Sequence, residues 1–254
     1  MKQGGLAVQL YTVREFMQTP RDIAASLRRV SGIGYRAVQG AGFADASPQQ
    51  VKQMLDDAGL YMCSTHTGIE RMLADLDAVI AEHKLWGCPH LAIPYLGQEY
   101  RGLEGLRRAA KAASEIGKKC ADAGLTLAYH NHSFEFERYG RKTGLDIFYE
   151  ESDPRYVEAE IDTYWVQHGG GDPAAWCARF KERMAAVHLK DMVIFNGQQT
   201  MAEIGEGNLN WPAILQICRQ VGVQWYIVEQ DICQRDPFES LAISYNNLRQ
   251  MGLE

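Results

Sequence analysis

The chain has 254 residues, of which 46% are hydrophobic and 23% are charged, and these proportions exclude collagen-like, coiled-coil and disordered chains. Its 26 basic and 32 acidic side chains leave a net charge of -6. Because no basic stripe interrupts this acidic balance, we expect neither nucleic acid nor an anionic membrane as the main partner. No run of about 18 uninterrupted apolar residues occurs, so no transmembrane helix is expected.

The ends of the chain and its cysteines indicate a compartment. The first residues lead straight into a strand-like segment at 6–10, without the apolar region and cleavage site of a signal peptide. The six cysteines are scattered and form no Cys-x-x-Cys pair. This pattern is typical of reduced, buried thiols. We therefore expect a cytoplasmic protein.

One pattern recurs along the whole sequence: an amphipathic stretch ends in glycine and a short apolar run follows. Gly59 precedes the apolar run 60–64, and Gly124 precedes the run 125–129. Glycine adopts the left-handed conformation that ends a helix, and the apolar runs are typical of parallel strands that are buried on both faces. Pairs such as Ser47-Pro48 mark helix starts.

Taken in chain order, the pattern predicts strands at 6–11, 35–40, 60–66, 90–95, 125–131, 157–163, 185–190 and 224–229. It predicts helices near 21–32, 47–58, 70–86, 102–123, 144–151, 173–184, 210–221 and 237–251. This alternation is the count of a (β/α)8 TIM barrel. A doubly wound open sheet is the alternative, which the even spacing and the lack of G-x-G-x-x-G after the first strand disfavour. With no linker visible, a single α/β domain over 1–254 is predicted.

The predicted strand ends are unusually polar. In such a barrel the catalytic groups lie at the C-terminal ends of the strands. One His or Asp there is more often a cap or a satisfied polar group than a ligand. Four consecutive strands, however, end in Glu or His, Asp, His and Glu. Because these ends converge, their carboxylates would repel one another unless a cation lay between them, and the set suits a divalent metal ion.

Five segments carry a family resemblance. They are YHNHSFEF at 129–136, EID at 160–162, VHLKD at 187–191, EIGEGNLNW at 203–211 and EQD at 229–231. On these segments the chain resembles the xylose isomerase-like TIM barrels of the sugar phosphate isomerase/epimerase superfamily, over essentially its whole length. The resemblance is specific for the superfamily and not for the substrate.

The resemblance implies one divalent metal ion, with Mn²⁺ as the first choice and Mg²⁺, Co²⁺ or Zn²⁺ as alternatives. The implied ligands are Glu135, Asp162, His188 and Glu229. It further implies that a proton is removed next to a metal-bound carbonyl of a keto-sugar or keto-polyol, through an enediolate that the cation stabilises. The expected partner is therefore a small sugar or polyol, and related barrels often form homodimers.

The strand-five motif leaves the outcome of the reaction open. In ketose 3-epimerases two metal-bound glutamates act as acid and base, which implies Glu135 and Glu229 here. The H-N-H-x-x-E-F arrangement looks more like inosose dehydratases and enzymes that eliminate from 3-keto-glycosides, which implies His132 as the base and Glu135 as a ligand. An isomerase or epimerase and a lyase both stay open. A non-catalytic sugar-binding barrel is the third hypothesis.

Further residues are expected around the substrate. His66 and Lys190 are candidates for a proton donor or for a clamp on substrate oxygens, although Lys190 can also pair with Asp191. Position alone puts four residues along the pocket: Gln9, Tyr11, Gln39 and Trp165. His130 is a candidate for substrate binding, or else it faces the helix layer. The loop 203–211 has no Lys or Arg to hold a phosphate, so a covering loop is expected there.

Overall fold

The barrel strands lie where the sequence predicts them. The structure is a computed structural model that describes residues 5–254; residues 1–4, which bear on the expected lack of a signal peptide, lie outside the described part. The eight parallel strands are β1 (Gly5–Gln9), β2 (Ala37–Gly40), β3 (Tyr61–Thr65), β4 (His90–Ile93), β5 (Thr126–His130), β8 (Val157–Asp162), β9 (Ala186–Leu189) and β12 (Trp225–Val228). Their order is β3-β2-β1-β12-β9-β8-β5-β4. A bridge between His66 and Ala92 joins the two edge strands, so the sheet is a nearly closed barrel.

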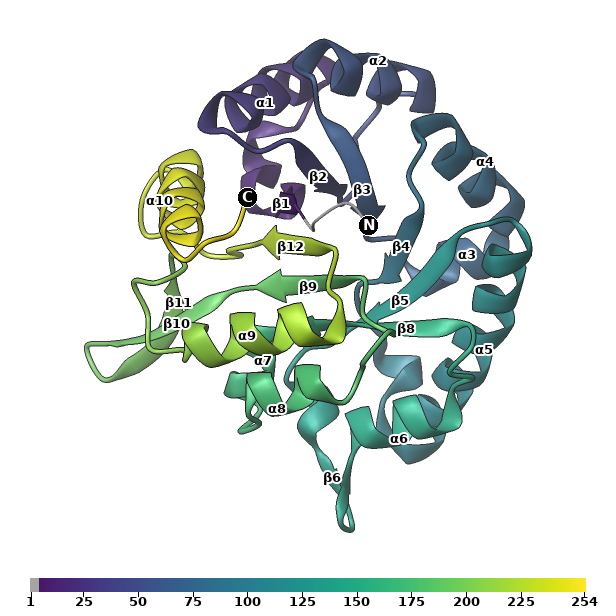
Figure 1. The fold of residues 1–254 in the computed structure, drawn as a ribbon. Coiled ribbons are helices and arrows are strands. Elements are labelled where there is room, and N and C mark those ends of the chain that lie inside the picture. Colours follow the sequence, from purple (N-terminus) through teal and green to yellow (C-terminus); the bar gives the residue numbers. More distant parts are fainter. Residues whose placement is uncertain (1–4) are drawn as a thin grey trace.

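Helices surround this barrel (Figure 1). The main ones are α1 (Pro20–Ile33), α2 (Pro48–Ala58), α4 (Leu76–Trp86), α5 (Gly102–Asp122), α6 (Gly144–Glu151), α8 (Pro173–Ala178), α9 (Trp211–Val221) and α10 (Pro237–Gln250). The TIM barrel prediction is therefore confirmed. Among the helices of residues 5–254, none combines the length and the apolar character that crossing a membrane requires.

Two predicted helices are shorter than expected. The helix predicted at 70–86 divides into α3 (Ile69–Ala74) and α4, because Asp75 leaves the helical conformation and its side chain caps α4 by accepting from the Ala78 N–H. The helix predicted at 173–184 ends at Ala178. After it the chain turns through Glu182 at φ +60° to reach β9. The predicted cap at Ser47 is confirmed, since its hydroxyl accepts from the Gln50 N–H.

Several short elements that the sequence did not predict follow the barrel strands. They are the 3-10 helices η1 (Leu10–Phe16), η2 (Gln98–Tyr100) and η3 (Phe134–Phe136), the helix α7 (Thr163–His168), and the hairpins β6 (Arg138–Tyr139)–β7 (Lys142–Thr143) and β10 (Asp191–Phe195)–β11 (Gln198–Ala202). Each comes after the C-terminal end of a barrel strand. They therefore surround the mouth of the barrel, where the polar strand ends lie.

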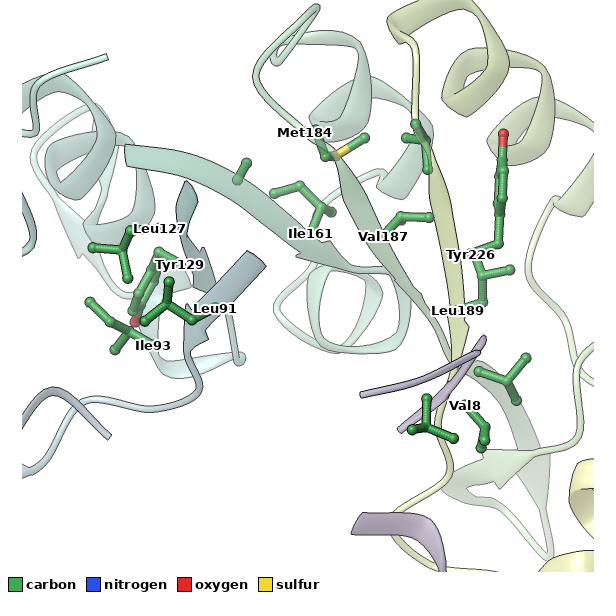
Figure 2. Close-up of a cluster of buried hydrophobic side chains, with 14 of the residues drawn as sticks. Val8, Leu91, Ile93, Leu127, Tyr129, Ile161, Met184, Val187, Leu189 and Tyr226 are labelled. Carbon is green, nitrogen blue, oxygen red and sulfur yellow. The ribbon is translucent and has the colours of Figure 1, made fainter. Parts of the chain in front are cut away.

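The main core lies between the strands and the helices. Alternate strand residues such as Val8, Leu127 and Val187 point outward and are completely buried there. Figure 2 shows part of this layer, with side chains from neighbouring strands gathered on the helix side of the sheet. Burial of such side chains contributes roughly 1.5–3 kcal/mol each. This apolar layer holds the strand ends in a fixed arrangement.

The barrel interior consists of two layers of different chemistry. The lower layer, toward the N-terminal ends of the strands, is small and apolar: Ala7, Ala37, Cys63, Ala186 and Ile227. The upper layer, toward the C-terminal ends, is polar: Gln9, Gln39, His130, Glu160 and His188, all at most 2% exposed. Because side chains alternate along a strand, residues two apart point the same way. The polar residues at the strand ends therefore meet inside the barrel.

Candidate functional site

Two imidazoles and two carboxylates meet at the ends of β5, β8, β9 and β12. They belong to His130, Asp162, His188 and Glu229, and one nitrogen or oxygen atom of each lies within 4.8 Å of the others. His188 Nδ1 is 2.9 Å from Glu229 Oε2, and His130 Nε2 is 3.7 Å from Asp162 Oδ2. All four side chains are buried. We call these four residues the metal-type cluster.

A second group shares both imidazoles of this cluster. His66, His130, Glu160 and His188 also offer atoms that lie within 4.8 Å of one another. Both oxygens of Glu160 already have hydrogen-bond partners, His66 Nε2 at 2.7 Å and Gln39 Nε2 at 2.8 Å. The two groups therefore lie on opposite sides of the rings of His130 and His188.

Glu135 is the predicted ligand that the structure does not bring into either group. Beyond His130 the chain leaves the strand, and η3 directs the Glu135 side chain away from the barrel axis. Its carboxylate accepts hydrogen bonds from the Tyr129 hydroxyl at 2.6 Å and from the His132 N–H at 3.0 Å. Tyr129 belongs to the apolar layer outside the barrel. At the end of β5, His130 therefore stands where the sequence analysis expected Glu135, and it faces inward.

Lys190 supplies positive charge inside the site. Its Nζ lies 2.7 Å from Glu229 Oε2, 3.2 Å from Asp162 Oδ2 and 3.0 Å from Asp231 Oδ2. Three carboxylates thus surround one buried ammonium group, and the expected alternative, a pair with Asp191, is not what the structure shows. The sequence analysis expected a metal ion to offset the repulsion among these carboxylates. In the structure, the ammonium group of Lys190 offsets part of this repulsion.

Asp191 instead holds the loop 203–211. Its carboxylate accepts hydrogen bonds from the backbone N–H groups of Gly205 and Leu209 and from the indole of Trp211. Glu203, in the same loop, accepts from the Ser240 hydroxyl of α10. A cavity of about 580 Å³ opens at the C-terminal end of the barrel, and within the described chain no residue of this loop lines it. The expectation of a covering loop is therefore wrong, because Asp191 ties the loop down beside the barrel.

The electrostatics of the site follow from burial and close opposite charges. Burial alone would lower the pKa of His188, but the neighbouring carboxylates of Glu160 and Glu229 raise it to about 10. Burial raises the pKa of Asp162 to about 6 in spite of Lys190 and His188. At Glu229 the effect of burial is outweighed, since Lys190 and His188 hold its pKa well below the usual range.

The cavity of about 580 Å³ opens above the metal-type cluster. The cavity is lined by Glu229 and by the predicted base His132. It is also lined by five residues that the sequence analysis expected near the substrate: Tyr11, His66, His130, Trp165 and Lys190. Gln9 does not line it. Its amide lies deeper in the barrel and donates to Gln39 Oε1 at 2.6 Å. A cavity of this volume has room for a small sugar or polyol.

His132 is an imidazole on the wall of this cavity that takes part in none of the ion pairs of the described chain. Burial and the charge of Lys190 lower its pKa to about 3, so the ring is neutral. Its neighbours are aromatic: the ring of Tyr95 lies 5.4 Å away and that of Trp165 lies 5.2 Å away, measured between centroids. A neutral imidazole can accept a proton from a molecule in the cavity.

Four residues of the site were not assigned from the sequence. Glu160 and Asp231 lie two residues from the predicted ligands Asp162 and Glu229, and the two-residue period of a strand is a pattern that points to both. Arg14 and Tyr95 also line the cavity. They follow strands in irregular segments, where no periodic pattern indicates the direction of a side chain.

The donor set of the metal-type cluster fits a divalent ion. Asp162 uses Oδ1 to cap α7, by accepting from the Trp165 N–H at 2.9 Å, while its buried Oδ2 contacts Lys190 Nζ at 3.2 Å without an aligned hydrogen bond within the described chain. A buried carboxylate oxygen without an aligned hydrogen-bond donor is uncommon in a native structure. Two carboxylates and two imidazoles are ligands that Mn²⁺, Co²⁺ and Zn²⁺ accept. This buried cluster can therefore hold a metal ion.

A family model described as xylose isomerase-like TIM barrel matches residues 27–244. The chain belongs to this family. An inosose dehydratase of Geobacillus kaustophilus is 24% identical over 198 residues, which are 65% of this chain and 61% of the dehydratase. The rhizopine catabolism protein MocC of Rhizobium meliloti is 25% identical over 55% of this chain and 47% of its own length. The chain thus spans less than two thirds of the length of these relatives.

A solved structure shares the whole architecture. A sugar phosphate isomerase/epimerase from Parabacteroides distasonis superimposes with a TM-score of 0.83 at 23% identity, over 99% of this chain and 96% of that one. At this identity the likeness shows the fold. Members of the family are enzymes, among them isomerases or epimerases and an inosose dehydratase.

Proposed function

We propose that this protein is a divalent-metal-dependent enzyme that removes a proton next to the carbonyl of a keto-sugar or keto-polyol. The observation that carries the proposal is the position of a neutral imidazole, His132, on the wall of the same cavity that His130 and Glu229 of the metal-type cluster line. A base and a cluster that suits a cation thus face one small volume. Removal of a proton beside a carbonyl needs a base, and a cation at the carbonyl oxygen stabilises the enediolate that forms.

The metal-type cluster would hold the ion through His130, Asp162, His188 and Glu229. Asp162 Oδ2 contacts Lys190 Nζ at 3.2 Å but accepts no aligned hydrogen bond within the described chain, which favours this group over the group around Glu160, in which both carboxylate oxygens are hydrogen-bonded. When bound, a divalent cation supplies a Lewis acid that stabilises negative charge on an adjacent substrate oxygen. Mn²⁺ is the first ion to test, with Mg²⁺, Co²⁺ and Zn²⁺ as alternatives.

The other residues of the cavity position the substrate. His132 accepts the proton. The ammonium group of Lys190, which three carboxylates hold in place, contributes positive charge on the cavity wall, and the ring of His66 offers a polar group to substrate oxygens. Trp165 and Tyr95 flank His132 and provide an apolar wall for the C–H face of a sugar ring while they exclude water.

A lyase is favoured over an epimerase by one observation. An epimerase of the kind that the resemblance implies uses two metal-bound glutamates, and here the strand-five glutamate, Glu135, lies outside both groups while His130 takes the strand end. The cavity therefore offers one free base, His132, which suits removal of a proton followed by departure of a leaving group. The similarity to an inosose dehydratase supports the same outcome.

Deuterium incorporation from D₂O tests the proposal. Protein loaded with Mn²⁺ would be incubated with a panel of ketoses, inososes and 3-keto-glycosides, followed by mass spectrometry of substrate and products. Exchange or elimination is expected with at least one class. Elimination selects the lyase, and exchange with an isomeric product selects the isomerase. If none of the four metal ions supports exchange with any member of the panel, the proposal is wrong.

His132→Gln is the variant that isolates the base. It should slow proton exchange by roughly 10²–10⁴-fold, the usual contribution of a positioned base, while Mn²⁺ content stays at the wild-type level. His90→Gln is the matched control, because His90 is also a buried histidine but begins β4 at the opposite end of the barrel. Full exchange activity in His132→Gln would assign the base to another residue.

A further inference from the structure

We propose that Glu160 is a positioning residue that decides which nitrogen of His130 and of His188 faces the metal-type cluster, and that orients His66 toward the substrate cavity. The inference deepens the proposed function and rests on it, because it concerns the ligands of the same metal site. Glu160 does not line the cavity and is not one of the four residues of the metal-type cluster. The inference gives this buried carboxylate a role.

Glu160 lies on β8 below the cavity, and its side chain is 1% exposed. Three imidazoles surround a single carboxylate oxygen. Oε1 is 2.7 Å from His66 Nε2, 3.2 Å from His188 Nε2 and 3.5 Å from His130 Nδ1. A carboxylate is rarely buried so completely without a specific set of partners, because its desolvation is unfavourable. These rings are the partners.

The same rings turn their other nitrogens to the metal-type cluster. His130 Nε2 is 3.7 Å from Asp162 Oδ2, and His188 Nδ1 is 2.9 Å from Glu229 Oε2. An imidazole that binds a metal ion carries one N–H and one lone pair, and an ionised carboxylate only accepts. His188 Nε2 faces Gln39 Oε1 at 2.6 Å and Glu160 Oε1 at 3.2 Å, and His130 Nδ1 faces Glu160 Oε1 at 3.5 Å. With the N–H of each ring on this side, the lone pair remains on the side of Asp162 and Glu229. A metal ligand must present a lone pair in this way.

A chain of two glutamines, whose orientation Glu160 also sets, requires the same orientation at His188. Gln39 donates its Nε2 to Glu160 Oε2 at 2.8 Å and to Ser64 Oγ at 3.1 Å. Its Oε1 is therefore the acceptor, and it receives Gln9 Nε2 at 2.6 Å and His188 Nε2 at 2.6 Å. This places the N–H of His188 on Nε2. The upper layer is thus one hydrogen-bonded network centred on Glu160.

His66 extends this network to the substrate cavity. Its ring stacks on the ring of His188, with centroids 5.0 Å apart and planes within 10° of parallel, and its side chain also lines the cavity. The hydrogen bond between His66 Nε2 and Glu160 Oε1 at 2.7 Å fixes the orientation of the His66 ring beside the predicted metal ligands. One carboxylate therefore orients two ligands and one residue that faces the substrate.

Binding of Mn²⁺ to Glu160→Gln tests the role. An amide has one acceptor oxygen and directs N–H groups at the rings, so the Mn²⁺ dissociation constant should rise by about 10–100-fold, the usual effect of losing a carboxylate behind a ligating histidine. In the Co²⁺-loaded variant, the visible absorption bands should shift. Glu158→Gln is the matched control, because Glu158 lies two residues earlier on β8 and accepts only the Ala185 N–H at 3.2 Å. The control should bind Mn²⁺ as the wild type does.

A measurement on the wild type keeps the inference testable if Glu160→Gln folds poorly. In Zn²⁺-loaded protein, imidazole ¹⁵N chemical shifts should show the proton of His188 on Nε2 and that of His130 on Nδ1. The opposite tautomers, or Mn²⁺ affinity and Co²⁺ bands unchanged in a folded Glu160→Gln, would overturn the role of Glu160 while the proposed function stands. A wild type that binds no divalent ion would overturn the metal site itself and this inference with it.

Discussion

The lower and upper layers of the barrel interior share three strands, β1, β2 and β9, on which their residues lie two apart, and they differ in polarity. The lower layer is built of alanines, one cysteine and Ile227, which fill the barrel without a polar atom in their side chains apart from one thiol. The upper layer carries two amides, two imidazoles and a carboxylate, all buried. Since the backbone is continuous through both, the difference lies entirely in the side chains that the strands direct inward.

This contrast separates stability from function. Apolar burial in the lower layer and outside the barrel stabilises the fold, whereas the upper region retains buried polar atoms that make no aligned hydrogen bond within residues 5–254, among them Asp162 Oδ2 and His132 Nδ1. Unsatisfied buried atoms are unfavourable for stability and concentrate where a ligand completes the network. Changes in the two layers should therefore affect different measurements.

The largest effect is expected from Asp162→Asn. Because the change removes one charge from a buried group, a loss of about 3–5 kcal/mol is typical, which corresponds to a rise of roughly a hundredfold to several thousandfold in the Mn²⁺ dissociation constant. The asparagine keeps Oδ1 and therefore the cap on Trp165 N. Isothermal titration with Mn²⁺ and D₂O exchange measure the outcome. Wild-type affinity in this variant would remove Asp162 from the ligand set.

Ile227→Ala makes the corresponding change in the lower layer. The side chain is fully buried, so its truncation leaves a cavity and should lower the free energy of unfolding by about 2–5 kcal/mol. Urea unfolding measures this loss. The Mn²⁺ affinity of the folded variant should match the wild type, because no polar contact of the upper layer is touched. A parallel loss of metal binding would show that the two layers are not independent.

A smaller, pH-dependent effect is expected from Glu135, which lies outside both layers. Burial raises its pKa to about 7, above the value near 4.5 of an unfolded chain, so the folded state holds this proton more tightly. The resulting stabilisation is complete below pH 4.5 and is lost as the pH rises through 7, by about 3 kcal/mol in total. Glu135→Gln stays neutral. Unfolding free energies at several pH values should show the wild type losing stability relative to this variant as the pH rises.

Glu135→Gln also sharpens the ligand assignment. Its carboxylate binds Tyr129 and the His132 N–H and lies in neither group of potential ligands, so the variant should keep Mn²⁺ binding close to the wild-type level. Loss of the metal in Glu135→Gln, with retention in His130→Gln, would restore the ligand set that the family resemblance implies.

The strand-five motif shows how far local patterns reach. The sequence left open whether His130 binds substrate or faces the helix layer, and the structure places its ring inside the barrel. The two-residue period of a strand says nothing about Glu135, which lies beyond the strand, because the path of η3 depends on contacts with Tyr129 and with the helix layer. For the same reason Arg14 and Tyr95, in segments after β1 and β4, could not be assigned from the sequence to the cavity.

Charge pairing depended on the fold to a similar extent. The sequence shows Lys190 next to Asp191, and a pair between them was one of two readings. In the barrel these neighbours point to opposite faces of the strand end, so Lys190 meets Glu229 and Asp231 from the segment after β12 while Asp191 binds backbone N–H groups of the loop 203–211. Only the pairing of β9 with β12 in the sheet selects between the two partners.

By itself, the sequence determined the eight β/α units, the positions of their strands and the concentration of histidines and carboxylates at the strand ends, because these depend on local periodicity and on the glycines and caps that end or begin helices. The tertiary structure alone decided that His130 rather than Glu135 joins Asp162, His188 and Glu229, and that Glu160 lies behind two of these residues. Those choices depend on distances between strands that are far apart in the chain. Barrel closure sets these distances, and local sequence patterns do not record them.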